Sequence, residues 1–324
     1  MQNKWQPTAN IAIIKQRAEI LNTIRNFFKK HNVLEVETPM LCQYSATTPY
    51  IDPIAVVCNE GVKRFLQTSP EYAMKRLLAA GIGDIFQLSR VFRGMEVGAL
   101  HNPEFTMLEW YRIGVDHHKL MKEIAELLKV CGINYGVCKI SYREIFIKYL
   151  QIDPVLADLQ ELKTLVYNNI KLSEQFKDSI INATKQDCQE LLFNHCIEPN
   201  LELNQILFIY NYPKEQAALA KVNKDQDGIE VAERFEVYIN GVELANGYHE
   251  LLDPVLQEQR FLADQDMRKN LGKPFLEIDP YLIAALNYGM PSCSGVALGI
   301  ERLLMLITKT NSIRDVICFP WDIA

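Results

Sequence analysis

A strand hairpin in the second half of the chain constrains the fold more than any other local feature. Apolar and polar residues alternate up to Ile239, Asn240-Gly241 follows, and the alternation resumes at Val242. Alternation with a period of two indicates a strand with one buried face. Asn-Gly is the dipeptide that best tolerates the positive φ angles of a two-residue hairpin turn. The sequence therefore predicts two antiparallel strands, with Glu243 on the second of them.

The same patterns predict the other elements. Apolar residues at three- and four-residue steps indicate helices, and Pro70-Glu71 is typical of a helix start. Helices are predicted at 11–31, 70–80, 281–286 and 300–308, and strands at 33–38, 84–92, 105–113 and 295–299. Residues 93–104 form a predicted loop, and residues 116–200 a helix-rich scaffold. Because short turns as well as helices join the strands, we expect an α+β fold with a mainly antiparallel sheet flanked by helices.

Composition excludes several classes of protein. The chain has 324 residues, of which 48% are hydrophobic and 23% charged, so it can bury a large core. It has no apolar run of about 18 residues and no signal-peptide core, which predicts a cytoplasmic protein with no membrane partner. Its eight cysteines include no CxxC pair, and its net charge of −6 argues against a large polyanionic partner.

Residues 294–303 contain a glycine-spaced apolar stretch that is followed by Arg302. Arginine holds phosphate oxygens with a planar fork of donors and never deprotonates, so Arg302 and the earlier Arg93 suit a bound triphosphate. Gly295 and Gly299 would let the backbone approach a nucleotide closely. A glycine in a strand equally marks a bend or a bulge, so this motif alone leaves both readings open.

Two further groups add to this pattern. The loop that Arg93 opens is closed by Asn102 and Phe105, so an adenine could lie against the ring while the arginine reaches a phosphate; the alternative is a polar hairpin tip. Glu243 and Glu250 flank a glycine that would allow both carboxylates to reach one Mg²⁺ ion. The alternative is an exposed strand acid and an unrelated loop acid. No GxxxxGK[ST] loop and no strand-linked GxGxxG occur, which excludes the commonest nucleotide folds.

At these residues the chain resembles the class II aminoacyl-tRNA synthetases, and within them the lysyl group. Residues 29–41 are similar to motif 1, 92–105 to motif 2 and 295–302 to motif 3, in that order. The strings HNPEFTM at 101–107 and ELANGYHEL at 243–251 are specific to lysyl-type enzymes. The resemblance covers nearly the whole chain. It implies the class II catalytic fold and a homodimer formed through motif 1.

Motif 1 begins within about the first thirty residues, so we expect one catalytic domain over 1–324 without an N-terminal OB-fold anticodon-binding domain. This form resembles the elongation factor P lysine ligases, which join (R)-β-lysine to the ε-amine of a lysine on elongation factor P. Ser69 and Ala297 agree with that family, where lysyl-tRNA synthetases tend to have alanine and glycine. No tRNA partner is then expected. Two alternatives are a stand-alone synthetase core acting on RNA and a non-catalytic regulatory paralogue.

By resemblance, ATP and Mg²⁺ are the cofactors, Arg93 and Arg302 are catalytic, and Glu243 and Glu250 hold the metal. The implied ATP-binding residues are Arg93, Gly94, Met95, Asn102, Phe105, Glu243, Leu244, Gly299 and Arg302. The implied substrate-binding residues are Ser69, Pro70, Glu71, Tyr111, Glu250 and Ala297. Met95 departs from the family, which usually has a glutamate there to accept a hydrogen bond from the adenine amino group. Glu96 would substitute if the loop shifts; otherwise adenine specificity rests on backbone groups and stacking, and a reduced ATP affinity is expected.

Overall fold

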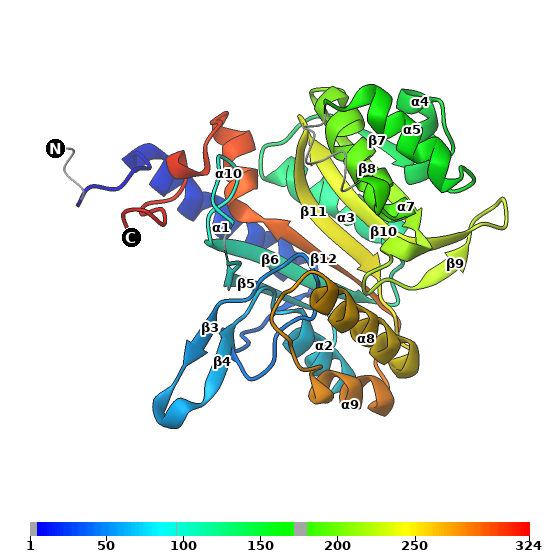
Figure 1. Ribbon diagram of the computed structural model, residues 1–324. Coiled ribbons are helices and arrows are strands. Elements are labelled where there is room, and N and C mark those ends of the chain that lie inside the picture. Colours follow the sequence, from blue (N-terminus) through cyan, green and yellow to red (C-terminus); the bar gives the residue numbers. More distant parts are fainter. Residues whose placement is uncertain (1–4, 95, 172–179) are drawn as a thin grey trace. The chain divides into compact units, whose positions relative to one another are not determined.

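The computed structural model describes residues 5–94, 96–171 and 180–324 (Figure 1). The chain forms two compact units, described separately below. The first unit comprises Met1–Asn134 and His249–Ala324, and the second comprises Tyr135–Tyr248. Most of the predicted site residues lie in the first unit, whereas Glu243 and Leu244 lie in the second.

The main sheet of the first unit has the strand order β1-β5-β6-β12. β1 is parallel to β5, and the β5-β6 and β6-β12 pairs are antiparallel. The bounds of these strands are β1 Leu34–Glu35, β5 Ile85–Phe92, β6 Glu104–Ile113 and β12 Cys293–Gly299. The predicted hairpin of residues 84–92 and 105–113 is therefore confirmed. The predicted strand at 33–38 pairs with its neighbour only at Leu34–Glu35, which is shorter than expected.

Helices pack around this sheet, and their bounds are α1 Ile11–Lys30, α2 Glu71–Ala79, α3 His117–Val130, α8 Pro254–Asn270, α9 Pro280–Tyr288 and α10 Ile300–Thr308. The first helix begins where the side chain of Asn10 accepts a hydrogen bond from the backbone N–H of Ile13. Its buried face includes Phe28, whose ring stacks on Phe86 of β5 with centroids 4.4 Å apart. The helices predicted at 11–31, 70–80, 281–286 and 300–308 are all confirmed.

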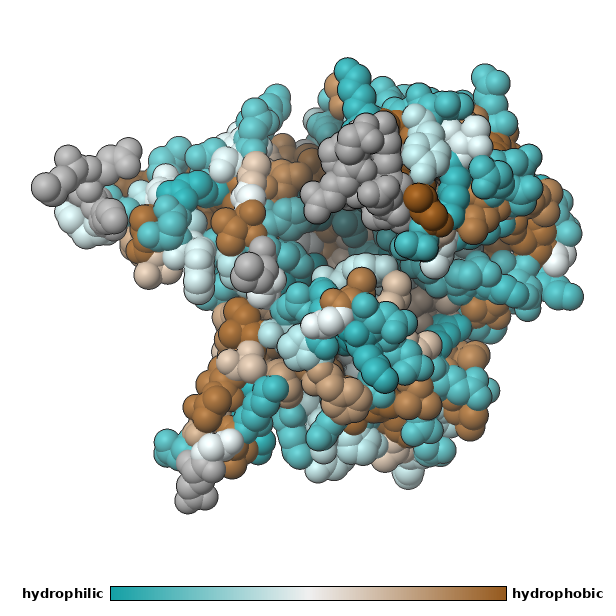
Figure 2. Space-filling view, viewed as in Figure 1, coloured by the Kyte–Doolittle hydropathy of each residue, from teal (hydrophilic) through white to brown (hydrophobic). Residues whose placement is uncertain are grey.

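A small second sheet in this unit has the order β2-β4-β3, with bounds β2 Leu41–Cys42, β3 Ala55–Val57 and β4 Lys63–Leu66. A 3₁₀ turn at Asn59–Gly61 joins β3 to β4, and another such turn spans Ile313–Asp315. The hairpin carries exposed apolar side chains, because Val57 is 74% and Val62 is 41% exposed (Figure 2). Apolar side chains exposed together on a hairpin are typical of surfaces that another protein covers.

The second unit is built on a sheet with the order β11-β10-β8-β7, and β9 pairs with β10. Its strands are β7 Gly136–Ser141, β8 Gln205–Pro213, β9 Val222–Lys224, β10 Glu230–Ile239 and β11 Val242–His249. Its helices are α4 Tyr142–Leu150, α5 Leu159–Asn169 and α7 Lys185–Leu192, with short turns at Phe193–Ile197, Glu198–Asn200 and Lys214–Gln216. The β10-β11 hairpin is confirmed, with φ of 53° at Asn240 and 73° at Gly241.

The predicted fold class is correct. Except for β1 with β5 and β7 with β8, the strand pairs named above are antiparallel, and helices flank the sheets. The strand β7, inside the stretch predicted as helix-rich scaffold, was missed. All eight cysteines are free, as their spacing suggested. Among the described residues, no helix has both the length and the apolar character needed to cross a membrane.

Candidate active site

Pairing of β6 with β12 sets the positions of the predicted substrate-binding residues in the first unit. In this register Ala297 lies opposite Glu109, and Gly295 lies opposite Tyr111. A Cβ atom on Gly295 would lie 2.3 Å from the Tyr111 ring and 2.7 Å from Oε1 of Glu250. Only glycine therefore lets the Tyr111 ring and the Glu250 carboxylate approach this strand together.

Three carboxylates and one lysine form a group that we call the carboxylate cluster: the buried Glu109, Glu250 and Lys75, and the partly buried Glu71. The Nζ atom of Lys75 lies 2.7 Å from Oε1 of Glu71 and 2.6 Å from Oε2 of Glu250. The Glu109 and Glu250 side chains are almost fully buried, and so is Lys75. Glu71 begins helix α2 and Lys75 lies one turn later, so the helix itself aligns this pair.

Glu109 accepts two hydrogen bonds within this site. The Tyr111 hydroxyl donates to its Oε1 at 2.7 Å, and the Ser69 hydroxyl donates to its Oε2 at 2.7 Å. Ser69 Oγ also accepts a hydrogen bond from the backbone N–H of Glu71 at 3.0 Å. The structure thus brings Ser69, Glu71, Tyr111 and Glu250 together around Glu109.

The cluster perturbs the acidities of its members. Burial, and next the charge of Glu71, raise the pKa of Glu109 to about 8. Burial raises the pKa of Glu250 to about 7, although Lys75 opposes that shift. Burial alone would lower the pKa of Lys75, but Glu250 and Glu71 together hold it above its usual value. Lys75 therefore stays charged, while Glu109 and Glu250 hold a proton more readily than exposed carboxylates do.

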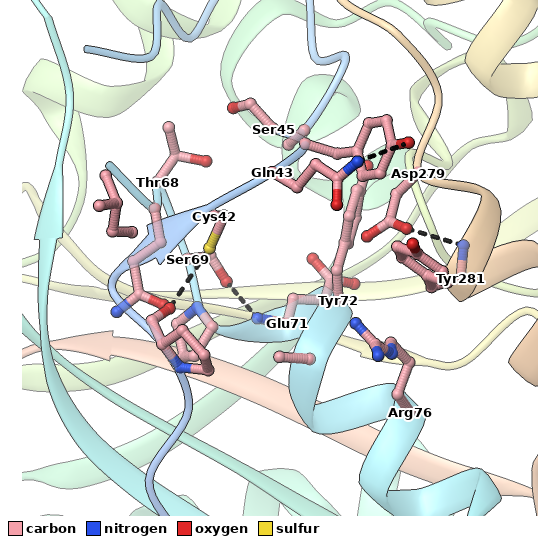
Figure 3. A pocket seen from close by; sticks show the side chains of 17 residues that line it. Cys42, Gln43, Ser45, Thr68, Ser69, Glu71, Tyr72, Arg76, Asp279 and Tyr281 are labelled. Atoms are coloured by element: carbon pink, nitrogen blue, oxygen red, sulfur yellow. Dashed lines mark hydrogen bonds between the residues drawn. The ribbon is translucent and has the colours of Figure 1, made fainter. Parts of the chain in front are cut away.

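A cavity of about 200 Å³ adjoins the first residues of α2 (Figure 3). Ser69, Pro70 and Glu71 line it, together with residues 42–46 and the start of α9 at Asp279 and Tyr281. The predicted substrate-binding residues Ser69, Pro70 and Glu71 are therefore accessible from a cavity. Its size suits a small molecule and excludes a folded macromolecule.

The two predicted catalytic arginines lie near the loop between β5 and β6. The guanidinium of Arg93 lies over the Phe105 ring, 5.2 Å from its centroid. Its Nε atom is buried and makes no hydrogen bond to any described residue. An Nη atom of Arg302 lies 2.8 Å from Nε2 of His101. Burial, and next the charge of Arg302, lower the pKa of His101, which favours a neutral ring that accepts this hydrogen bond.

These arginines fit an anionic nucleotide, because Arg93 keeps a buried donor available and both cations lie at one loop. Asn102 fits less directly. Its amide group donates to the Glu104 carbonyl at 2.7 Å and accepts from the Trp321 backbone N–H at 3.0 Å. These bonds give Asn102 a role in holding the loop. Gly94 and Gly299 flank the arginines, whereas Met95 lies outside the described residues.

The two predicted magnesium ligands, Glu243 and Glu250, belong to different units of the chain. Glu250 belongs to the carboxylate cluster of the first unit, and its Oε2 is paired with Lys75. Glu243 and Leu244 lie on β11 of the second unit, where Glu243 is opposite Tyr238. Carboxylate oxygens are ligands that Mg²⁺ accepts. A shared metal at Glu243 and Glu250 stays a prediction.

Sequence reasoning missed Lys75 and Glu109. Both had a signal, because Lys75 is four residues after Glu71 on a predicted helix and Glu109 is two residues before Tyr111 on a predicted strand. These spacings place each residue on the same face as a predicted substrate-binding residue.

Comparisons with known proteins show the family of the chain. Residues 5–322 match the family model described as tRNA synthetases class II (D, K and N). A protein of Proteus mirabilis named elongation factor P (R)-beta-lysine ligase is 44% identical over 98% of this chain and 97% of its own length. A protein of the same name from Edwardsiella ictaluri is 43% identical over 98% of both chains.

Proposed function

Because the chain belongs to the class II tRNA synthetases of the D, K and N type, we propose that it is an ATP-dependent ligase acting on elongation factor P. In this proposal it activates (R)-β-lysine as an adenylate and transfers the β-lysyl group to the ε-amine of an acceptor lysine. The names of the two relatives support the acceptor and the amino acid. The carboxylate cluster supports the class of amino acid independently.

The charge balance of the carboxylate cluster is the observation that carries the proposal. Two carboxylates, those of Glu71 and Glu250, pair with the buried ammonium of Lys75, and the buried Glu109 adds a third, so two negative charges would remain if all were ionised. Buried charges need partners, which makes two further ammonium groups the matching ligand. A diamino acid such as β-lysine carries two. The raised pKa of Glu109 fits this arrangement, because a proton takes the place of a cation until the substrate binds.

Charge alone does not distinguish β-lysine from α-lysine. Ser69 and Ala297 are the positions that differ from the lysyl-tRNA synthetase pattern, and both lie at Glu109: Ser69 donates to its carboxylate, and Ala297 is opposite it in the sheet. A methyl or hydroxyl group contributes about 1 to 3 kcal/mol to such discrimination. These two residues therefore tune the preference for the shifted amino group.

In the proposed first step, Arg93 and Arg302 hold the negative charge of ATP while the substrate carboxylate attacks the α-phosphorus in line. Pyrophosphate leaves and the aminoacyl adenylate forms. Magnesium would neutralise phosphate charge, with Glu243 and Glu250 as its ligands. In the second step the acceptor ε-amine, once it has lost its proton, attacks the adenylate carbonyl and AMP leaves.

Other parts of the prediction stay within this proposal. They are a single catalytic domain over 1–324, a cytoplasmic location and a homodimer. The homodimer, through motif 1, rests on the family resemblance. The net charge of −6 supports a protein acceptor over tRNA.

The deciding experiment uses purified protein with Mg-ATP and (R)-β-lysine. We expect amino-acid-dependent pyrophosphate exchange, and a gain of one β-lysyl group by elongation factor P in its intact mass. Arg302→Ala should abolish exchange while the thermal unfolding transition is retained. Near-normal exchange by that variant would refute the role of Arg302.

Two outcomes would favour the alternatives. Labelling of tRNA alone would identify a stand-alone synthetase core acting on RNA. Binding of ATP or β-lysine without any exchange would identify a non-catalytic paralogue.

A further inference from the structure

The backbone on either side of Arg93 is fixed by three consecutive hydrogen bonds. The N–H of Phe92 donates to the Gln67 carbonyl at 2.9 Å, and that of Arg93 donates to the Pro103 carbonyl at 2.8 Å. The N–H of Gly94 donates to the Asp52 carbonyl at 2.7 Å. The first two bonds reach segments next to the β5-β6 hairpin. The third reaches a separate loop, residues 48–52, so the direction of the chain after Arg93 depends on that loop.

The third hydrogen bond requires a close approach. A Cβ atom on Gly94 would lie 3.1 Å from the Asp52 carbonyl oxygen, tighter than nearly all real contacts of that kind. A side chain at this position would therefore push the Asp52 carbonyl away or lengthen the hydrogen bond. This contact explains why glycine follows Arg93 here, in a motif where the resembling family usually has asparagine.

Arg268 of α8 donates hydrogen bonds to the loop 48–52. Arg268 is only 1% exposed, and its Nη1 donates to the Thr48 carbonyl at 3.1 Å and to the Ile51 carbonyl at 3.2 Å. Its Nη2 donates to Oδ1 of Asp52 at 3.3 Å. Its Nε donates to the Pro274 carbonyl at 3.1 Å. One buried guanidinium therefore contacts Thr48, Ile51 and Asp52 of the loop and connects the loop to the end of α8.

The burial of this cation has a physical consequence. Removing an arginine from water is costly, so the site is kept only where the fork of donors is fully used. Three of the four contacts are to backbone carbonyls, which makes the guanidinium a brace for the loop conformation more than an ion pair. A lysine at this position has the same charge but cannot reach several carbonyls in one plane.

We propose that Arg268 is a positioning residue for ATP binding: it holds residues 48–52 so that the Asp52 carbonyl fixes Gly94, and thereby the backbone that presents Arg93. The inference rests on the proposed function, in which Arg93 contacts ATP. Arg268 itself does not touch the nucleotide in this proposal. Its effect passes through two backbone contacts, Arg268 to the loop and the loop to Gly94.

The test compares Arg268→Lys, Gly94→Ala and the double variant. Each single variant should weaken the binding of Mg-ATP, measured by calorimetry without amino acid, by about tenfold or more, because a misplacement of about 1 Å costs up to 100-fold. The KM for ATP should rise, while the KM for the amino acid stays unchanged. Hydrogen exchange at the Gly94 amide should become faster in both variants.

The double variant provides the sharper result. Both substitutions should break the same contact, the one between the loop 48–52 and Gly94. In that case the affinity of the double variant for Mg-ATP equals that of whichever single variant has the lower affinity. Effects that multiply would show two independent defects and would overturn the proposal. Wild-type Mg-ATP affinity in Gly94→Ala would also overturn it, whether or not Arg268→Lys folds.

Lys273→Met is the matched control. The Lys273 ammonium lies 3.0 Å from Oδ2 of Asp52, on the carboxylate that Arg268 also contacts, and no contact to a loop carbonyl accompanies this ion pair in the described structure. Near wild-type Mg-ATP affinity is expected, and a loss as large as that of Arg268→Lys would show that charge near Asp52 matters instead of the loop conformation. Failure of the proposed function is separately visible, because it concerns transfer to elongation factor P by the wild type.

Discussion

The two units of the chain each bury carboxylates beside tyrosine hydroxyls, but they balance the charge in opposite ways. In the second unit, Glu236 is paired with Arg234 and accepts hydrogen bonds from Tyr212 and Tyr238, both at 2.7 Å, and from Asn246 at 3.2 Å. One anion there meets one cation and three neutral donors. In the carboxylate cluster of the first unit, Glu71 and Glu250 share the single cation Lys75, and Glu109 is a third carboxyl group without a cation of its own.

This difference separates a structural polar group from a ligand site. The Glu236 network has its charge balanced within the chain, and Tyr212 and Tyr238 also belong to the hydrophobic core of that unit. Such a network fixes the packing of its strands. The carboxylate cluster reaches charge balance only when positive charge or protons are added. The raised pKa values of Glu109 and Glu250 are consistent with this excess of negative charge. Both groups combine glutamates, tyrosines and a cation, so the charge balance is what distinguishes them and what supports the proposed ligand site.

The largest effect on stability is expected from Glu236→Gln in the second unit. Arg234 cannot lose its proton, so its buried charge would be left without a counter-ion, and the free energy of unfolding should fall by about 3 to 5 kcal/mol. Urea unfolding monitored by circular dichroism measures this change. Affinity of the folded protein for β-lysine should stay at the wild-type value. A stability loss below about 1 kcal/mol would contradict a structural role for the network.

Glu109→Gln should show the reverse pattern. Losing one carboxylate that pairs with a substrate ammonium should cost about 2 to 5 kcal/mol of β-lysine binding, measured by calorimetry. The free energy of unfolding should not fall, because burial already disfavours the ionised form of Glu109. Unchanged substrate affinity in this variant would remove Glu109 from the binding site.

Lys75→Met probes the cation of the carboxylate cluster. Without the ammonium, Glu250 can take up a proton, so the loss of stability should be smaller than for Glu236→Gln, about 1 to 3 kcal/mol. The pKa of Glu250 should rise above its value of about 7, because Lys75 is the group that lowers it. Thermal unfolding between pH 6 and pH 9 measures both effects. A loss of stability equal to that of Glu236→Gln would show that the carboxylate cluster and the Glu236 network do not differ in charge balance.

The smallest effect is a pH dependence of substrate affinity. Burial raises the pKa of Glu109 from its ordinary value of 4.5 to about 8, so the free protein keeps this proton at pH 7. A substrate ammonium favours the carboxylate, so binding should release the proton and affinity should rise with pH, by less than tenfold per pH unit, until about pH 8. The same shift means that the folded protein binds more protons than the unfolded chain between these two values. The contribution of Glu109 to stability therefore declines as pH rises from 4.5 to about 8. Glu109→Gln should remove both the pH dependence of substrate affinity and the pH dependence of stability.

Much of the fold was predictable because its signals are local. The Asn240-Gly241 turn, the helix start at Pro70-Glu71 and the hairpin around Arg93 each depend on a few neighbouring residues. The strand at residues 33–38 was overestimated, since the extent of pairing is decided by the partner strand and not by β propensity. The strand β7 was missed for the same reason, because its partner β8 lies more than sixty residues further along the chain.

The sequence by itself determined the α+β class and the order of the motifs, and it predicted Ser69, Glu71, Tyr111 and Glu250, which the structure brings together, because spacing within one helix or strand decides which side chains share a face. Only the tertiary structure decided that Lys75 pairs with both Glu71 and Glu250, that Ser69 and Tyr111 donate to Glu109, and that Arg268 braces the loop at Gly94. Apart from the local pairs Lys75–Glu71 and Tyr111–Glu109, these contacts join segments far apart in the chain. Charge balance and close backbone approach are properties of space, and no local pattern records them.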